Sequence, residues 1–247
     1  ALFLAVLMNF FSYFFSGKMV LAIYRAKPLA KADAPGIHKM VEDLAKKVGI
    51  PKPKLYVIPT EAPNAFASGR NPENGILALT HGIMKLMDKK ELEGVIAHEL
   101  GHIKNRDILI STIAATLASV IMYIASMARF AALFGGVRDE NNSGSNILQL
   151  LVVAIIAPLA AMLIQLTISR SREYIADETS AKLTKEPRHL ASALQKLENY
   201  SKNVPFRLGN QATGSLFIIN PFTKVNFASI FSTHPSTADR ISRLMKM

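Results

Sequence analysis

The sequence predicts a mainly helical α+β fold in which a domain with a small β-sheet is interrupted by a membrane-spanning helical hairpin. Two long uncharged runs, residues 108–128 and 147–166, reach the length of about 20 apolar residues that crosses a bilayer. Outside them, amphipathic helical patterns alternate with three short apolar stretches bounded by proline and glycine. These observations predict an anchor helix, a first domain half, the hairpin and a second domain half at 1–24, 25–107, 108–169 and 170–247.

A third uncharged run, residues 1–17, is shorter than a bilayer span requires. We expect it to be the end of a longer span that begins before the first residue. A signal peptide is the competing interpretation, but no basic segment precedes the run and no small-residue cleavage site follows it. Buried core helices are the alternative for the two longer runs, although such helices seldom extend so far without a charge.

The net charge of +11 is concentrated outside the apolar runs. Residues 25–107 contain 14 Lys and Arg against 10 Asp and Glu, and residues 170–247 contain 12 against 6. Under the positive-inside rule both segments face the cytoplasm, which predicts a multi-pass protein of the plasma or inner membrane. No nucleic-acid-binding motif accompanies the charge, so a nucleic-acid partner is not expected and the lipid bilayer is the simpler one.

Local patterns predict the elements between the apolar runs. Apolar positions at helical spacing predict a helix at 34–48, which Gly49 and two following prolines end. The capping-box pair Asp88 and Glu91 predicts the start of a helix that continues to about residue 105. The sheet strands are expected at 54–58, 64–68 and 76–80, and further helices at 170–183, at 188–200 and after Pro235.

An HExxH motif, formed by His98, Glu99 and His102, lies within the helix predicted from Asp88. Two histidines four residues apart share a helical face and can bind one zinc ion. Glu99 projects beside them and is expected to act as a general base towards the attacking water. The alternative is an exposed helix whose two histidines align by chance. The chain has no cysteine, which excludes a cysteine-ligated metal.

A catalytic zinc ion usually has three protein ligands, so the motif needs a third. The metzincin pattern is absent, because Asn105 and Ile108 stand where that pattern requires glycine and histidine. A spacing of four places Glu173 and Asp177 on one helical face, either as ligand and orienting partner or as a solvated acidic pair. The residues alone leave five possible third ligands: Glu173, Asp177, Glu178, His189 and His234.

Four strings follow one another in order along nearly the whole chain. They are residues 63–67, residues 95–107, residues 169–177 and Thr233-His234-Pro235. Together they resemble the HtpX-type heat-shock membrane proteases, a gluzincin family related to the CAAX prenyl proteases. The resemblance implies a gluzincin-like zinc protease domain with Glu173 as third ligand and Asp177 as the partner of a zinc-binding histidine. It also implies catalysis at the cytoplasmic face and a role in membrane-protein quality control.

Two further expectations concern the substrate. His234 is expected to donate a hydrogen bond to the oxyanion of the intermediate, unless it merely caps the following helix. The stretch Asn64, Ala65 and Phe66 is expected to form an edge strand that pairs with the substrate backbone, unless it is an ordinary strand end. Residues 209–222 suggest no role.

The sequence therefore predicts a membrane-bound zinc metalloendopeptidase, with one zinc ion per chain, that hydrolyses misfolded or damaged membrane proteins. The motif ends a few residues before the run at 108–128, so the metal is expected near the cytoplasmic headgroup layer, with both ligand-bearing helices continuing into spans. The alternatives are a processing protease for one defined substrate, such as a prenylated peptide, and a catalytically silent zinc-binding membrane scaffold. No oligomeric state follows from the sequence.

Overall fold

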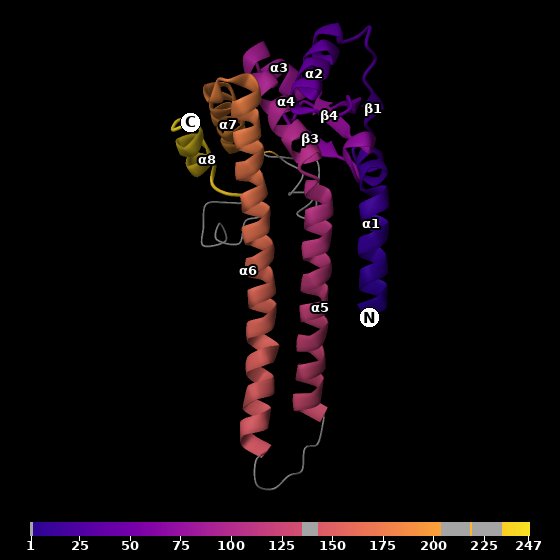
Figure 1. Cartoon of the computed structure of the whole chain (residues 1–247), viewed down its shortest axis with the longest axis vertical. Helices are drawn as coiled ribbons and strands as arrows, with labels where there is room; N and C mark the ends of the chain where they lie inside the picture. The colour runs from indigo at the N-terminus through magenta and orange to yellow at the C-terminus, as the bar shows by residue number, and fades with distance from the viewer. Residues whose placement is uncertain (1, 135–142, 204–217, 219–233) are drawn as a thin grey trace.

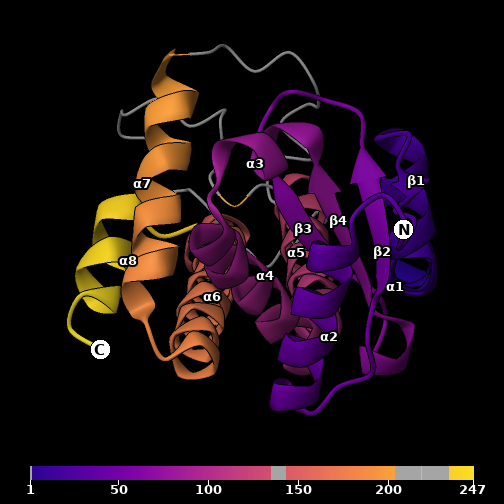
Figure 2. The same cartoon turned by 90° about the horizontal axis from the view of Figure 1, so that it is seen from above.

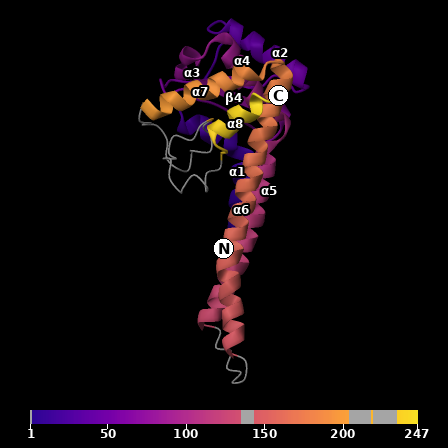
Figure 3. The ribbon, with the colours of Figure 1, turned by 90° about the vertical axis from the view of Figure 1, so that its left-hand side faces the viewer.

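The computed structural model of the chain describes residues 2–134, 143–203, 218 and 234–247. The stretch 209–222 lies outside these residues except for Ile218. A domain of short helices and strands stands at one end of two long antiparallel helices, as Figures 1 and 3 show from two sides. This arrangement confirms the predicted mainly helical α+β class with a small sheet.

Three helices are long and apolar enough to cross a membrane. They are α1 (Leu2–Ile23), α5 (Asp107–Phe134) and α6 (Ser143–Thr184), and α1 and α6 both pack beside α5. Few residues of their apolar stretches are buried, and large side chains such as Phe3 and Phe130 are mostly exposed. Apolar surface of this extent matches a lipid environment rather than water.

The connection between the domain and the long helices differs on the two sides. On one side α6 passes the predicted boundary at 169 without a break, so the helix predicted at 170–183 is its continuation. On the other side α4 (Lys89–Lys104) ends before α5 begins, because Arg106 takes a left-handed conformation with φ 54°. The expected continuity into a stretch of membrane-spanning length therefore holds for α6, whereas α4 ends before such a stretch begins.

The sheet has four described strands in the order β1-β2-β4-β3. Strands β2 and β4 are parallel, whereas β1 and β3 pair antiparallel with their neighbours. Three strands were predicted; the two-residue β1 is too short to carry an alternating pattern. The strand bounds are Lys27–Pro28 for β1, Lys54–Ile58 for β2, Ala65–Ser68 for β3 and Ile76–Thr80 for β4.

The two faces of the sheet bury different partners. The main core joins the sheet to α2 (Pro35–Val48) and α4, which Figure 2 shows from above. On the opposite face, Phe66 packs with Val20 of α1 and with Tyr24, which directly follows α1. Helix α1 comes so close that a Cβ on Gly17 would lie 2.7 Å from the Ile76 side chain. Helix α1 is thus part of the folded domain as well as a candidate span.

Helix α4 lies between α6 and α7 (Pro187–Asn203), and α8 (Thr237–Leu244) packs on both of these. Two glycines of α4 permit this closeness. A Cβ on Gly94 would lie 2.9 Å from the Leu190 nitrogen, and one on Gly101 would lie 3.2 Å from the Ala176 Cα. The remaining short helices are α3 (His81–Leu86) and the 3₁₀ turn η1 (Pro72–Asn74).

Candidate active site

The predicted capping box fixes the start of α4. The Asp88 side chain accepts hydrogen bonds from the backbone of Lys90 and Glu91, and the Glu91 carboxylate accepts from the Asp88 N–H at 2.9 Å. The same carboxylate accepts from Ser192 and Lys196 of α7, each at 2.6 Å. The beginning of α4 is therefore held from two sides, and the motif histidines follow two to four turns later.

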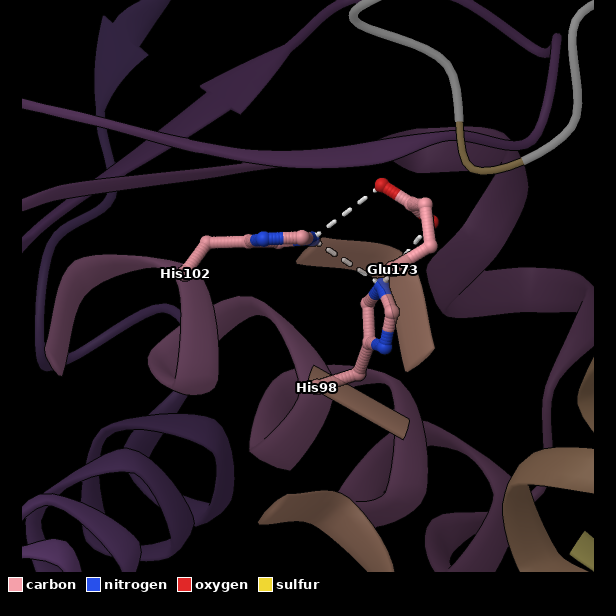
Figure 4. A group of neighbouring side chains, drawn as sticks. All are labelled: His98, His102 and Glu173. Carbon is pink, nitrogen blue, oxygen red and sulfur yellow. Dashed lines mark hydrogen bonds and ion pairs between the residues drawn. The ribbon is translucent and has the colours of Figure 1, made fainter. Parts of the chain in front are cut away.

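Three side chains meet in a small cluster formed by α4 and α6 (Figure 4). The Nε2 atoms of His98 and His102 are 3.1 Å apart. The Glu173 carboxylate oxygens lie 3.7 Å from the His98 Nε2 and 3.6 Å from the His102 Nε2. The structure thus brings together the two motif histidines and the glutamate that the resemblance selected.

This donor set fits a zinc ion. Two zinc–ligand bonds of 2.0–2.1 Å at a tetrahedral angle place their donor atoms roughly 3.3–3.4 Å apart. The separations of 3.1–3.7 Å in the cluster lie around that value. Two imidazoles with one carboxylate are also a combination that zinc enzymes use, with a fourth position left for water.

Both imidazoles are oriented through their other ring nitrogen. The Nδ1 of His98 lies 3.0 Å from the Asp177 carboxylate, the partner that the resemblance implied. The Nδ1 of His102 lies 2.6 Å from the carboxylate of Asp107, the first residue of α5. Such carboxylates fix the ring orientation and leave Nε2 free to bind a metal.

Two arginines hold these carboxylates. Arg172 of α6 donates from Nε to Asp107 at 2.5 Å and from Nη2 to the Asn105 carbonyl at 3.3 Å. Arg240 of α8 is fully buried and donates to both oxygens of Asp177 at 2.7 and 2.9 Å. The Arg240 Nη1 also lies 3.0 Å from the Glu173 carboxylate. One guanidinium therefore contacts the candidate ligand Glu173 and also Asp177, which orients the candidate ligand His98.

Glu99 is buried beside the cluster, and its carboxylate accepts a hydrogen bond from the Ala67 N–H at 2.7 Å. Burial raises the pKa of Glu99, and the nearby His102 and His98 oppose this rise only in part. A raised pKa suits a carboxylate that takes up a proton and later releases it near neutral pH.

In the metal-free protein, the groups around His102 favour its protonated ring. Burial would lower the pKa of His102, but the hydrogen bond with Asp107 and the nearby Glu173 and Glu99 outweigh burial and raise it to about 9. Metal binding requires the neutral ring, so it must release this proton.

Strand β3 is the outer strand of the described sheet and lies along the site. The Asn64 carbonyl accepts a hydrogen bond from the Thr80 N–H. Along an antiparallel strand, successive residues point their backbone N–H and C=O groups alternately towards and away from the neighbouring strand, so those of Ala65 and Ala67 point away from β4. The Ala67 N–H reaches Glu99 instead. The Phe66 side chain lies instead in the apolar cluster with α1. The Asn64 side chain accepts a hydrogen bond from the Ile218 N–H at 3.3 Å.

The remaining candidates lie at different distances from the cluster. The His234 Nδ1 is 3.3 Å from the Glu173 carboxylate, so His234 belongs to the site. Glu178 is exposed and pairs with Lys182 at 2.6 Å. His189 lies on α7 and does not join the group of possible ligands among the described residues.

Sequence reasoning missed Asp107, Arg172 and Arg240. Asp107 lies five residues after His102 and outside the HExxH pattern, so the spacing of the motif does not point to it. Arg240 shares one face of α8 with the buried Leu244, and an arginine on the apolar face of a short helix was the available signal.

A buried His, His and Glu donor cluster on α4 and α6, in a chain with three helices of membrane-spanning length, is typical of a membrane metalloprotease. Comparison with known proteins supports this class, since the model of peptidase family M48 matches residues 31–247. The chain belongs to peptidase family M48.

Similar proteins include two that are named Protease HtpX homolog. That of Pyrococcus furiosus is 52% identical over 244 residues, which cover 99% of this chain and 84% of the relative. The homolog from Syntrophobacter fumaroxidans is 53% identical over 246 residues, which cover 99% of this chain and 87% of the relative. These relatives confirm the resemblance noted from the four strings.

The crystal structure of S. mikatae Ste24p has a similar fold, with a TM-score of 0.62 at 20% sequence identity. The match covers 98% of this chain and 56% of Ste24p, so the chain spans little more than half the length of that protein.

Replacing Asp107 is expected to weaken metal binding. Asp107→Ala removes the hydrogen bond that orients His102 and leaves Arg172 without its carboxylate, so zinc affinity should fall about 10- to 100-fold. Competition with a chromophoric chelator measures this affinity. The control Asp43→Ala, at an exposed position of α2, should leave it unchanged. Equal affinities for the two variants would show that Asp107 does not orient the ligand.

Proposed function

We propose that this chain is a zinc-dependent endopeptidase that binds one zinc ion through His98, His102 and Glu173. The observation that carries the proposal is the three-residue donor cluster with Glu99 buried beside it. A zinc ion held there supplies Lewis-acid activation of the attacking water and of the scissile carbonyl. Asp177 and Asp107 keep the two imidazoles in orientation.

The residues around the cluster have distinct roles in the proposal. Glu99 takes a proton from the attacking water and delivers it to the leaving nitrogen. On the outer edge of β3 in the described sheet, the Ala65 N–H and C=O and the Ala67 C=O pair with the substrate, while the Ala67 N–H holds Glu99. The predicted contribution of Asn64 and Phe66 reduces to holding that edge in place. His234 donates a hydrogen bond to the oxyanion, which its closeness to Glu173 supports.

The same proposal places the site at the cytoplasmic face of the membrane. Asp107, which contacts a candidate ligand, is also the first residue of an apolar stretch long enough to span. The basic excess in residues 25–107 and 170–247 supports a cytoplasmic location for both halves of the domain. The division at 1–24, 25–107, 108–169 and 170–247 stays a prediction.

Misfolded or damaged membrane proteins are the substrate class that we propose, in the manner of protein quality control. The outer position of β3 supports this choice, because backbone pairing along a strand edge accepts many sequences in extended conformation. A processing protease for one defined substrate remains a second candidate only through the fold shared with Ste24p. A catalytically silent scaffold is disfavoured by Glu99, which a metal-holding site does not need.

Metal removal tests the proposal. Detergent-purified protein should contain one zinc ion per chain by elemental analysis and should cleave unfolded casein. Stripping with 1,10-phenanthroline should abolish cleavage, and added zinc should restore it. Full cleavage by metal-free protein would overturn the mechanism.

The proposed orientation has a separate test. Because the chain has no cysteine, a Lys52→Cys variant can be labelled at a single site in sealed vesicles. Labelling is expected only from the cytoplasmic side.

A further inference from the structure

The cavity at the cluster extends beyond the metal ligands into the membrane-spanning part of the molecule. It has a volume of about 420 Å³ and reaches from His98 and Glu99 to α1 and α5. Its lining on α5 follows one helical face, from Asp107 to Ala115. Eight residues of helix correspond to about 12 Å, so the cavity runs along roughly two turns of the span.

The membrane arm, as we call the part of the cavity formed by α1 and α5, is lined by Asp107, by four uncharged polar side chains and by the apolar Ile108 and Ala115. It carries Asn9 and Ser12 from α1, with Ser111 and Thr112 from α5, all within stretches long and apolar enough to cross a membrane. Neighbouring positions of α5 that do not line the cavity carry exposed apolar side chains, of which Ile113 is 51% exposed. Polar side chains in a span are costly and mark functional sites.

The polar groups of the membrane arm are only partly used within the protein. Thr112 donates to the Ile108 carbonyl of its own helix at 2.7 Å. Asn9 donates to Thr116 at 3.3 Å and so joins α1 to α5 in the membrane arm. Ser12 and Ser111 are exposed and have no hydrogen-bond partner among the described residues. Their hydroxyls are available to a bound molecule.

An extended polypeptide matches both ends of the cavity. At the domain end, the outer edge of β3 in the described sheet presents the Ala65 N–H and C=O and the Ala67 C=O. In the membrane arm, a polypeptide that has left helical conformation must find partners for its backbone groups, since lipid offers none. Hydroxyl and amide side chains meet that need. A length of about 12 Å accommodates about four residues at 3.3 Å each.

We propose that the membrane arm binds the unwound end of a substrate's membrane-spanning segment, so that the substrate is cut within a few residues of where it leaves the bilayer. This inference rests on the proposed endopeptidase function and specifies which bonds it reaches. A bond far from a span gains nothing from the membrane arm, whereas a bond at the end of a span gains the additional contacts.

Two substrates and two variants test this inference in proteoliposomes. The substrates share one cleavage sequence, placed either two residues from a model transmembrane segment or in a soluble peptide. Ser111→Phe fills the membrane arm, and its control Ser126→Phe adds the same ring at an exposed position of α5 outside the cavity. We expect Ser111→Phe to lower the ratio of kcat/KM for the tethered over the soluble substrate about tenfold, and Ser126→Phe to leave the ratio unchanged.

Photocrosslinking supplies a readout independent of turnover. A benzophenone amino acid at position 12 or 111, in the Glu99→Gln background, should crosslink to substrate residues within the hydrophobic segment, as identified by mass spectrometry. Crosslinks to lipid only, or an unchanged substrate ratio in Ser111→Phe, would overturn the inference while leaving the endopeptidase intact. A wild-type protein that cleaves neither substrate would instead refute the proposed function. Retained zinc content shows that each variant is folded.

Discussion

Glu99→Gln is expected to lower kcat/KM for casein by about 10²- to 10⁴-fold while the protein keeps its zinc. Glutamine has nearly the shape of glutamate and still offers an oxygen to the Ala67 N–H, so the local geometry persists. What disappears is the group that carries the proton from water to the leaving nitrogen. Burial raises the pKa of Glu99, which brings it closer to the neutral range where a proton carrier works best.

The measurement pairs initial rates of casein cleavage with elemental analysis of the same preparation. Glu93→Gln on the same helix is the matched control, because Glu93 is half-buried and does not line the cavity. Equal rates for Glu99→Gln and wild type would refute the general-base role. Loss of zinc in Glu99→Gln would mean that Glu99 helps to hold the metal.

Sequence reasoning succeeded where the determinants are local. The capping box and the HExxH spacing lie within one helix, and helical periodicity alone places His98 and His102 on one face. The apolar runs and the strands at 54–58 and 76–80 also follow from short-range patterns. The third candidate ligand could not be identified from local patterns. Glu173 lies 71 residues after His102, and spacing within its own helix cannot relate it to α4. Only the family resemblance selected it.

Contacts between distant elements explain what was missed. Arg240 reaches Asp177 only because α8 folds back onto α6 and α7. The break at Arg106 was missed for a related reason. It turns Asp107 back towards His102, and a continuous helix would have carried that carboxylate away. The resulting bond ties the candidate metal site to the first residue of a membrane-spanning stretch.

Arg240→Leu is expected to destabilise the metal-free protein by about 3–5 kcal/mol, because it leaves Asp177 and Glu173 buried without their shared cation. For a domain of this size, the melting temperature should fall on the order of 10 °C. Bound zinc would partly replace the lost positive charge beside Glu173. The fall in melting temperature should therefore be smaller in zinc-loaded protein than in stripped protein.

Arg243→Leu separates this effect from the loss of any arginine on α8. Arg243 is exposed and stacks on the Tyr174 ring at 3.9 Å, so its removal costs surface contact but buries no unpaired carboxylate. Thermal melts of both variants, with and without zinc, make the comparison. If Arg240→Leu melts like Arg243→Leu in both states, the buried guanidinium does not balance the two carboxylates. A large shift that zinc reduces would show that α8 stabilises the site through charge, since lost packing alone would not respond to the metal.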